Sequence, residues 1–197
     1  MGERTASIVR ETNETRISLE LNLDGRGSYE VETGVGFFDH MLSHIAKHGM
    51  LDLQVRATGD LQVDAHHTVE DIGIVLGQAI AQAVGDKRGI FRYGSALCPM
   101  DEALVGVALD LCGRSYLNYD LSLATERVGE FDAELALEFF RAVADNARMT
   151  LHIWQQYGRN THHILEAAFK AFGRALDSAT GYDSRRQGDL PSTKGTL

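Results

Sequence analysis

The sequence has few cysteines and no long apolar run. Its two cysteines, Cys98 and Cys112, lie in apolar, strand-like stretches. We expect both to be reduced and buried, with a disulfide or a catalytic thiol as the alternative. No run of about 18 apolar residues is present, which argues against a membrane span. The first residues also lack the apolar core of a signal peptide. These absences predict a cytoplasmic protein.

Positive charge is also scarce. The chain has 19 Lys and Arg against 28 Asp and Glu, a formal net charge of −9. A nucleic-acid partner is not expected, because such a surface needs a basic stripe to neutralise phosphates. A small anionic substrate remains compatible, since a few local Arg and Lys side chains are enough to hold one phosphate. Hydrophobic residues make up 44% of the chain and charged residues 24%, which is typical of a globular protein.

Periodicity predicts an α+β fold. Alternating apolar and polar residues indicate strands, whereas apolar residues three or four apart indicate helices. The expected strands are 6–11, 16–23, 29–32, 51–57, 92–97, 103–110, 116–121 and 150–155, and the expected helices are 37–48, 66–84, 134–147 and 161–180. Segment 29–32 follows a glycine-containing turn and is expected to return along the preceding strand.

The order strand-strand-helix-strand-helix occurs twice, which predicts a duplication. We expect one domain over 1–197, built from halves at about 6–90 and 91–180, with the helices packed on one side of the sheets. The tail at 182–197 is rich in Arg, Gly, Asp and Ser and is expected to be mobile. Aligning 51–53 with 149–151 places His40 opposite Glu138.

One five-residue pattern, His-His-x-x-Glu, occurs in both halves, at 66–70 and 162–166. Residues four apart share a helix face, whereas adjacent residues diverge by about 100°. Each helix therefore offers one chelating His/Glu pair and one separate imidazole. Two such helices predict two metal sites that each draw on both repeats. The first would contain His66, Glu70 and His163, the second His162, Glu166 and His67, with His40 and Glu138 as candidates to complete one site each.

Nitrogen and carboxylate ligands suit Mn, Fe, Co, Ni or Zn, and spacing does not choose among them. The absence of a cysteine cluster argues against structural zinc. The alternative is that a His-His pair is only a helix start. Three further histidines are less specific: His44 and His48 follow His40 at four-residue spacing and could form a metal or substrate wall or be exposed, and His152 is expected to be packed or on the surface.

The residues then become recognisable as a family pattern. The matching stretches are RETNET at 10–15, GFFDHML at 36–42, HHTVED at 66–71, RYG at 92–94, PMDEA at 99–103, GR at 113–114, NTHHILE at 160–166, FKAF at 169–172 and PSTKG at 191–195. Along nearly its whole length the chain resembles imidazoleglycerol-phosphate dehydratase, a hydro-lyase of histidine biosynthesis.

The resemblance implies a duplicated fold related to the second domain of ribosomal protein S5, assembled as a homo-oligomer of 24 subunits. It implies active sites between subunits, each with two Mn²⁺ ions. By motif matching, the first ion would be held by His40, His67, His162 and Glu166, and the second by His66, Glu70 and His163. Glu138 stands where part of the family has a fourth ligand, a histidine.

The resemblance also implies the chemistry. D-erythro-imidazoleglycerol phosphate would lose water to give imidazole acetol phosphate, with the two ions stabilising an imidazolate and a diazafulvene. Glu14 matches the family's acid/base glutamate. The implied catalytic residues are Glu14, His40, His48, His67 and Glu166. The implied substrate-binding residues are Glu14, His40, His48, His66, Glu70, Arg92, Arg114, His162, Lys170, Ser192, Thr193 and Lys194, of which Arg92, Arg114, Lys170, Ser192 and Lys194 would hold the phosphate.

Two other functions use similar residues. A dinuclear hydrolase of phosphate esters could use the same ligands, but it would release phosphate, whereas the lyase forms a ketone that retains it. A metal store or sensor is the second alternative. A ferritin-like store should be nearly all helical, which the alternating segments oppose, and a DNA-binding sensor would need a basic reading element.

Overall fold

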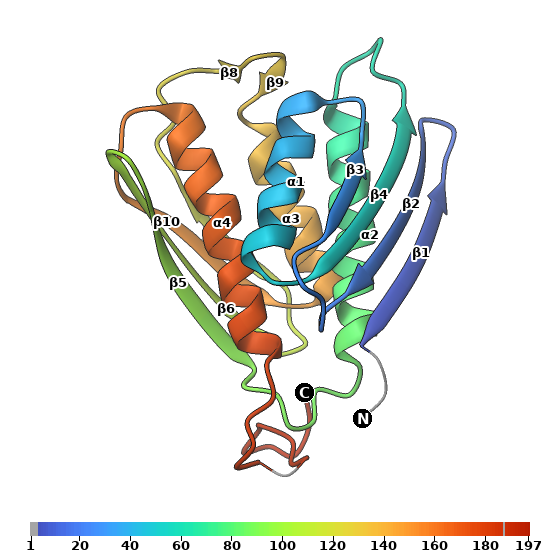
Figure 1. Cartoon of the computed structure of the whole chain (residues 1–197), viewed down its shortest axis with the longest axis vertical. Helices are drawn as coiled ribbons and strands as arrows, with labels where there is room; N and C mark the ends of the chain where they lie inside the picture. The colour runs from blue at the N-terminus through green and yellow to red at the C-terminus, as the bar shows by residue number, and fades with distance from the viewer. Residues whose placement is uncertain (1–3, 187) are drawn as a thin grey trace.

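The computed structural model describes residues 4–186 and 188–197 (Figure 1). Within this part of the chain, two successive runs of strands and helices follow the same order. The first run contains β1 (Thr5–Glu11), β2 (Thr15–Asn22), β3 (Tyr29–Glu32), α1 (Gly36–His48), β4 (Asp52–Gly59) and α2 (His66–Val84). The second contains β5 (Tyr93–Met100), β6 (Ala103–Asp110), β7 (Tyr116–Asp120), α3 (Leu135–Ala147), β10 (Thr150–Tyr157) and α4 (Thr161–Thr180), with the short pair β8 (Arg127–Val128) and β9 (Phe131–Asp132) before α3.

Each run folds into a four-stranded sheet with the same strand order. The order is β1-β2-β4-β3 in the first and β5-β6-β10-β7 in the second. In both sheets the first three strands are antiparallel neighbours, and the last strand, β3 or β7, lies parallel to β4 or β10. The predicted duplicated α+β fold is therefore confirmed.

The expectation that segment 29–32 returns along the preceding strand is wrong. β3 lies on the far side of β4, where Val31 pairs with Val55 in parallel register. Parallel neighbours cannot be joined by a tight hairpin, so α1 forms the crossover from β3 to β4. Each half thus contains a short third strand that the strand-strand-helix-strand-helix order omits.

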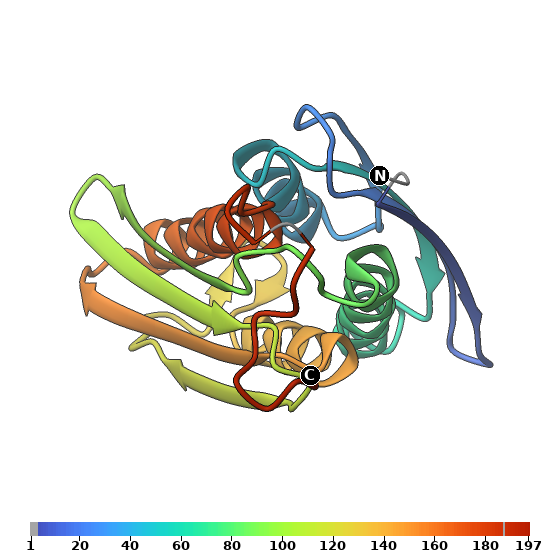
Figure 2. The same ribbon diagram turned by 90° about the horizontal axis from the view of Figure 1, so that it is seen from below.

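The four helices α1 to α4 lie between the two sheets (Figures 1 and 2). The inner face of each sheet is apolar. On β2, for example, Ile17, Leu19 and Leu21 are buried while the residues between them face outward. The prediction that helices cover one side of each sheet is confirmed, and the two halves share one helical layer as their common core. None of the described helices is long and apolar enough to cross a membrane. Cys98 and Cys112 are buried and unpaired.

The C-terminal segment folds back beneath the helices (Figure 2). Tyr182 forms a β-bridge with Ile90, the Asp183 amide donates to the Gly89 carbonyl at 2.8 Å, and Arg92 donates to the Pro191 carbonyl at 2.8 Å. These contacts hold the segment against residues 89–92. Its mobility during substrate binding stays a prediction.

Two glycines on α2 allow the halves to approach closely. A Cβ added at Gly73 would lie 2.7 Å from the carbonyl oxygen of Phe139, and one at Gly77 would lie 2.7 Å from the Val143 carbonyl oxygen on α3. Such distances are shorter than van der Waals contact. At these two positions the helices meet backbone to backbone.

Replacement of Gly73 by Ala tests this contact. In an ordinary helix the change stabilises by roughly 0.5–1 kcal/mol. Here we expect it to destabilise by about 1–3 kcal/mol, because the added methyl overpacks a rigid backbone contact. Gly36→Ala is the matched control, since a Cβ there meets nothing within 4 Å. Chemical denaturation measures both variants, and equal stability of the two would contradict the packing account.

Candidate metal centre and active site

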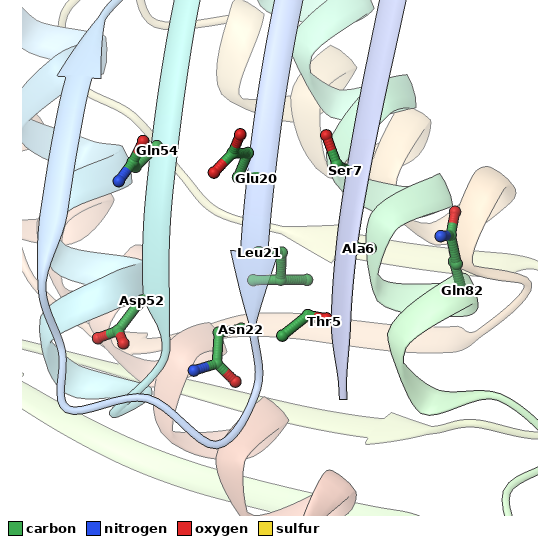
Figure 3. A pocket seen from close by; sticks show the side chains of 9 residues that line it. All are labelled: Thr5, Ala6, Ser7, Glu20, Leu21, Asn22, Asp52, Gln54 and Gln82. Carbon is green, nitrogen blue, oxygen red and sulfur yellow. The ribbon is translucent and has the colours of Figure 1, made fainter. Parts of the chain in front are cut away.

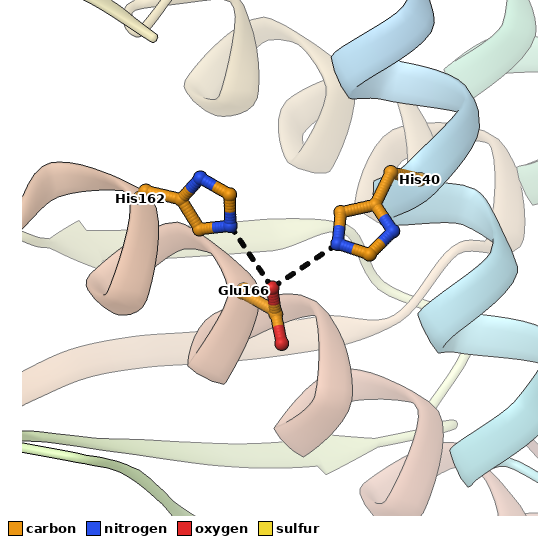
Figure 4. A group of neighbouring side chains, drawn as sticks. All are labelled: His40, His162 and Glu166. Atoms are coloured by element: carbon orange, nitrogen blue, oxygen red, sulfur yellow. Dashed lines mark hydrogen bonds and ion pairs between the residues drawn. The ribbon is translucent and has the colours of Figure 1, made fainter.

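Three side chains from two helices converge near the N-terminal end of α4 (Figure 4). His40 is on α1, and His162 and Glu166 are on α4. The Oε2 atom of Glu166 lies 3.2 Å from Nε2 of His40 and 3.1 Å from Nε2 of His162. The ligand atoms of the three residues all lie within 4.8 Å of one another. This group, called below the His40 group, is the only one of its kind among the described residues.

Local sequence explains how α4 presents its two members. The helix begins after Asn160, whose side chain accepts hydrogen bonds from the backbone amides of His162 at 2.9 Å and His163 at 3.4 Å. Asn is a favoured N-cap because it satisfies amides that have no partner within the helix. His162 and Glu166 are then one turn apart on the same face, as the four-residue spacing predicts.

α1 approaches α4 closely because two glycines face each other. A Cβ at Gly49 would lie 2.9 Å from the carbonyl oxygen of Gly173, and one at Gly173 would lie 2.6 Å from the carbonyl oxygen of Ile45. The close contact keeps the two helices side by side and places His40 across from Glu166. The group therefore depends on packing between the two halves.

The carboxylate of the group is buried, whereas its imidazoles are accessible. The side chain of Glu166 is 6% exposed, against 48% for His40 and 40% for His162. Burial alone would raise the pKa of Glu166, but it is outweighed by hydrogen bonds from Lys170 and His162 and by the charge of His44, which is protonated at acidic pH, and the pKa falls to about 2. The carboxylate is thus ionised. Its Oε1 atom is bound by Lys170 and His44, whereas the imidazoles beside Oε2 remain accessible.

His44 belongs to this neighbourhood although its sequence signal was weak. Its Nε2 lies 3.3 Å from Oε1 of Glu166 and 3.2 Å from Nε2 of His40. Burial lowers the pKa of His44 to about 4, with Glu166 opposing the shift only in part. Near neutral pH the ring is uncharged. The spacing from His40 was the only signal that could have identified it.

Aromatic rings hold His162 from the other side. The Phe37 ring packs edge-on against the His162 ring with 5.2 Å between centroids, and Phe131 of β9 lies 5.3 Å from Phe37. Phe131 is fully buried. These contacts between α1, the β8–β9 hairpin and α4 restrict rotation of the His162 ring.

The second histidine of each His-His pair bonds to a carboxylate elsewhere. His67 places Nδ1 3.0 Å from Asp60 and Nε2 3.8 Å from Glu14, and His163 places Nδ1 2.7 Å from Glu102. The hydrogen bond to Asp60 raises the pKa of His67, and the bond to Glu102 raises the pKa of His163. Sequence spacing gave no indication of Asp60 or Glu102.

The predicted second set of ligands does not gather within one described chain. His66, Glu70 and His163 form no group with ligand atoms within 4.8 Å, and His67 lies outside the His40 group. The Glu138 carboxylate instead accepts a hydrogen bond from Arg141 at 2.5 Å. One chain therefore brings together three of the four predicted ligands of one ion, His40, His162 and Glu166, and provides the remaining ligands separately.

The predicted phosphate-binding residues are also dispersed. Arg92 donates to both oxygens of Asp110, at 2.6 and 2.9 Å, and its backbone amide donates to Ala179 near the end of α4. At 1.5 Å per residue, Ala179 is about 20 Å along the helix from Glu166. Of the remaining predicted residues, Lys170 pairs with Glu166 at 2.5 Å, Ser192 donates to the Thr196 carbonyl at 2.9 Å, and Arg114, Thr193 and Lys194 are exposed.

Of two further histidines, His48 lies near this region and His152 lies away from it. The His48 ring follows His44 at 5.6 Å between centroids and borders a hollow with Ser95 and Arg174. His152 is exposed on β10, with its ring 5.7 Å from that of Tyr116. It was expected to be packed or on the surface.

A separate hollow lies along β1 and β2 of the first sheet (Figure 3). Its lining residues come from β1, β2, β4 and α2 and are Thr5, Ala6, Ser7, Glu20, Leu21, Asn22, Asp52, Gln54 and Gln82. None of them is a predicted site residue. This hollow is therefore separate from the predicted site residues.

A duplicated α+β chain with a helix-borne His/Glu group defines a class of enzyme that could use a divalent cation. The comparisons with known proteins name the family. The sequence profile of the imidazoleglycerol-phosphate dehydratase family matches residues 33–176. The chain belongs to this family of lyases.

Relatives match over the whole length of the chain. The chain is 61% identical to imidazoleglycerol-phosphate dehydratase of Acetivibrio thermocellus over 195 residues, covering 99% of this chain and 100% of that one. It is 60% identical to the enzyme of Desulforamulus reducens over 197 residues, with full coverage of both. Among solved structures, the dehydratase of Staphylococcus aureus superposes with a TM-score of 0.83 at 44% identity, covering 91% of this chain and 99% of that one. The Pyrococcus furiosus enzyme, solved in complex with (S)-C348, gives 0.84 at 38% identity, covering 96% and 100%.

The buried His44 ring predicts a pH dependence of stability. The unfolded chain protonates His44 near the ordinary histidine pKa of 6.5, whereas the folded chain does so only at a pKa of about 4. Between these values the unfolded state binds more protons, so the free energy of unfolding falls as pH decreases from 6.5 to 4. We expect metal-free wild type to lose about 1–2 kcal/mol more than His44→Asn between about pH 7 and pH 4.5.

Chemical denaturation of both proteins at the two pH values measures this difference. Equal losses for wild type and His44→Asn would show that the ring is not held neutral by burial. Because both proteins contain the other histidines, the difference between their losses isolates the contribution of His44.

Proposed function

We propose that the His40 group and the separate His/Glu pairs act together as a two-metal dehydratase site. Family membership assigns the reaction, which is dehydration of imidazoleglycerol phosphate in histidine biosynthesis. The observation that supports the site is the convergence of His40, His162 and Glu166 in a chain of this family. The product of the reaction would be imidazole acetol phosphate, with the phosphate retained.

The donor set fits a divalent transition metal. Two accessible imidazole nitrogens and an ionised carboxylate oxygen face one point, and this mixture suits Mn, Fe, Co, Ni or Zn. We propose Mn²⁺, with two ions in each active site. His40, His67, His162 and Glu166 would hold one ion, and His66, Glu70 and His163 the other, with Glu138 as a further candidate. When bound, such ions supply positive charge that stabilises negative charge on the substrate's imidazole ring.

The dispersion of the parts supports sites shared between subunits. His67 lies outside the His40 group, and the segment around Arg92 and Pro191 is about 20 Å along α4 from Glu166. A substrate with an imidazole at one end and a phosphate at the other cannot reach across that distance within one chain. A homo-oligomer that brings the tail region of one copy to the His40 group of another would complete the site. We propose a 24-subunit assembly, as the family resemblance implies, acting in the cytoplasm.

Glu14 is the proposed acid/base residue. Its side chain is 54% exposed and its Oε1 lies 3.8 Å from Nε2 of His67. The turn that carries it is fixed by Thr12, whose hydroxyl accepts from the amides of Glu14 at 3.1 Å and Thr15 at 3.0 Å. An exposed carboxylate on a fixed turn can take a proton from a carbon of a substrate bound beside His67.

The phosphate would be held by cationic and hydroxyl groups of the tail and nearby turns. Arg114 and Lys194 are exposed and available, and Ser192 and Thr193 lie on the same tail segment. Arg92 anchors that segment through the Pro191 carbonyl while it pairs with Asp110. Arg92 would therefore support the phosphate-binding segment in addition to contacting the phosphate itself. Closure of the segment would exclude water from the reacting substrate.

Incubation with imidazoleglycerol phosphate and Mn²⁺ tests the function. We expect formation of a ketone that retains its phosphate, detected by mass spectrometry, and loss of the reaction with a chelator. A His162→Asn variant is the matched control, because it removes one nitrogen donor of the His40 group from a half-buried side chain. Release of inorganic phosphate without the ketone would instead indicate a hydrolase.

A further inference from the structure

The duplication places one glutamate at the same position in each half. Glu14 directly precedes β2, and Glu102 directly precedes β6. β2 and β6 occupy the second place in two sheets of identical strand order. Each glutamate also lies beside the second histidine of the His-His pair in its own half, His67 or His163. The two residues are structural counterparts, but their contacts differ.

Glu102 is fixed by hydrogen bonds on both of its oxygens. Oε1 accepts from the backbone amides of Arg159 at 3.1 Å and Asn160 at 2.8 Å, and Oε2 lies 2.7 Å from Nδ1 of His163. Two of these partners form the turn that leads into α4. One carboxylate therefore joins the β5–β6 turn, the start of α4 and the His163 ring.

The contact with His163 determines which ring nitrogen carries hydrogen. An ionised carboxylate can only accept a hydrogen bond, so Nδ1 of His163 must be the donor. In the neutral ring this leaves Nε2 without hydrogen and with its lone pair directed away from Glu102. The nearest acidic atom to Nε2 is Oδ2 of Asp101 at 3.8 Å, which is beyond hydrogen-bond distance. Nε2 is thus the atom presented for coordination.

In the first half a different carboxylate, that of Asp60, contacts Nδ1 of the equivalent histidine. Asp60 contacts Nδ1 of His67 at 3.0 Å, which leaves Glu14 without a hydrogen bond to that ring. The difference follows from loop length. Residues 60–65 separate β4 from α2, whereas only 158–160 separate β10 from α4. The longer loop contains its own carboxylate, and the shorter one has none, so Glu102 of the neighbouring turn takes that place.

We propose that Glu102 is a positioning residue that fixes His163 with Nε2 directed toward a divalent cation, and that Glu14 is its counterpart left free for proton transfer. This inference rests on the proposed function for the presence of the cation. Carboxylates that hold the second nitrogen of a metal-binding histidine commonly contribute about 10–100-fold to metal affinity. Asp60 performs the corresponding task for His67.

Glu102→Gln separates positioning from folding. The amide oxygen can still accept from Arg159 and Asn160, but the amide NH₂ now faces Nδ1 of His163 as a donor. The ring must then carry its hydrogen on Nε2, which blocks coordination by that atom. We expect Mn²⁺ titration followed by elemental analysis to show one of the two ions bound about 10–100-fold more weakly, with little change in thermal stability.

Two comparisons make the outcome specific. Glu14→Gln, the same substitution at the counterpart position, should leave Mn²⁺ binding unchanged and reduce turnover. Asp60→Asn should weaken the other ion. Unaltered affinity for both ions in Glu102→Gln would overturn the proposal. If wild type binds two ions but forms no ketone, the proposed reaction fails while the positioning role stands.

A measurement on wild type avoids reliance on a variant. In metal-free protein at alkaline pH, ¹⁵N solid-state NMR of labelled histidine reports which ring nitrogen carries hydrogen, with His163→Asn used for assignment. We expect hydrogen on Nδ1 of His163. Hydrogen on Nε2 in the neutral ring would contradict the proposal whatever the variants do.

Discussion

A single buried carboxylate, that of Glu166, determines the arrangement of the candidate metal centre. It is 6% exposed and ionised, and its two oxygens face His40 and His162 on one side and His44 and Lys170 on the other. A charge at this depth is tolerated only with such partners. The partners come from both halves of the chain, so the packing of α1 against α4 and the chemistry of the centre depend on each other.

The duplication provides the frame for this dependence. Two sheets of the same strand order enclose one layer of helices, and glycines at the helix contacts let backbones meet. The two His-His-x-x-Glu helices begin from loops of different length, and this difference changes which carboxylate holds each second histidine. Equivalent positions therefore have different contacts, and the tasks proposed for Glu14 and Glu102 differ accordingly. A duplicated fold allows such a division. In the second half Glu102 holds the histidine ring, whereas in the first half Asp60 makes that contact and Glu14 does not.

Much of the fold follows from local pattern. Alternation and helical periodicity predicted all of the long strands and helices, and the repeated motif revealed the duplication. The parallel pairing of β3 was missed, because a four-residue strand has no local signal for its partner. The pairing of His162 with Glu166 was predictable from helix geometry. The repeat register marked His40 only as a candidate to complete one of two sites, and its assignment to the same ion as His162 and Glu166 came from the family resemblance.

The remaining features of the site depend on contacts between residues far apart in the sequence. No spacing rule connects Glu102 to His163 or Arg92 to Asp110, since loop lengths and tertiary packing determine these pairs. The sequence also contained no signal that His67 lies outside the His40 group within one chain. That separation is the main support for the proposal that the complete site lies between subunits.

Anomalous diffraction from crystals of the Mn²⁺-loaded assembly tests this account most directly. The account predicts a manganese peak at the His40 group, contacted by His40, His162 and Glu166 of one chain and by His67 of a neighbouring chain. A peak at which every protein ligand belongs to the same chain, or no peak beside Glu166, would contradict it.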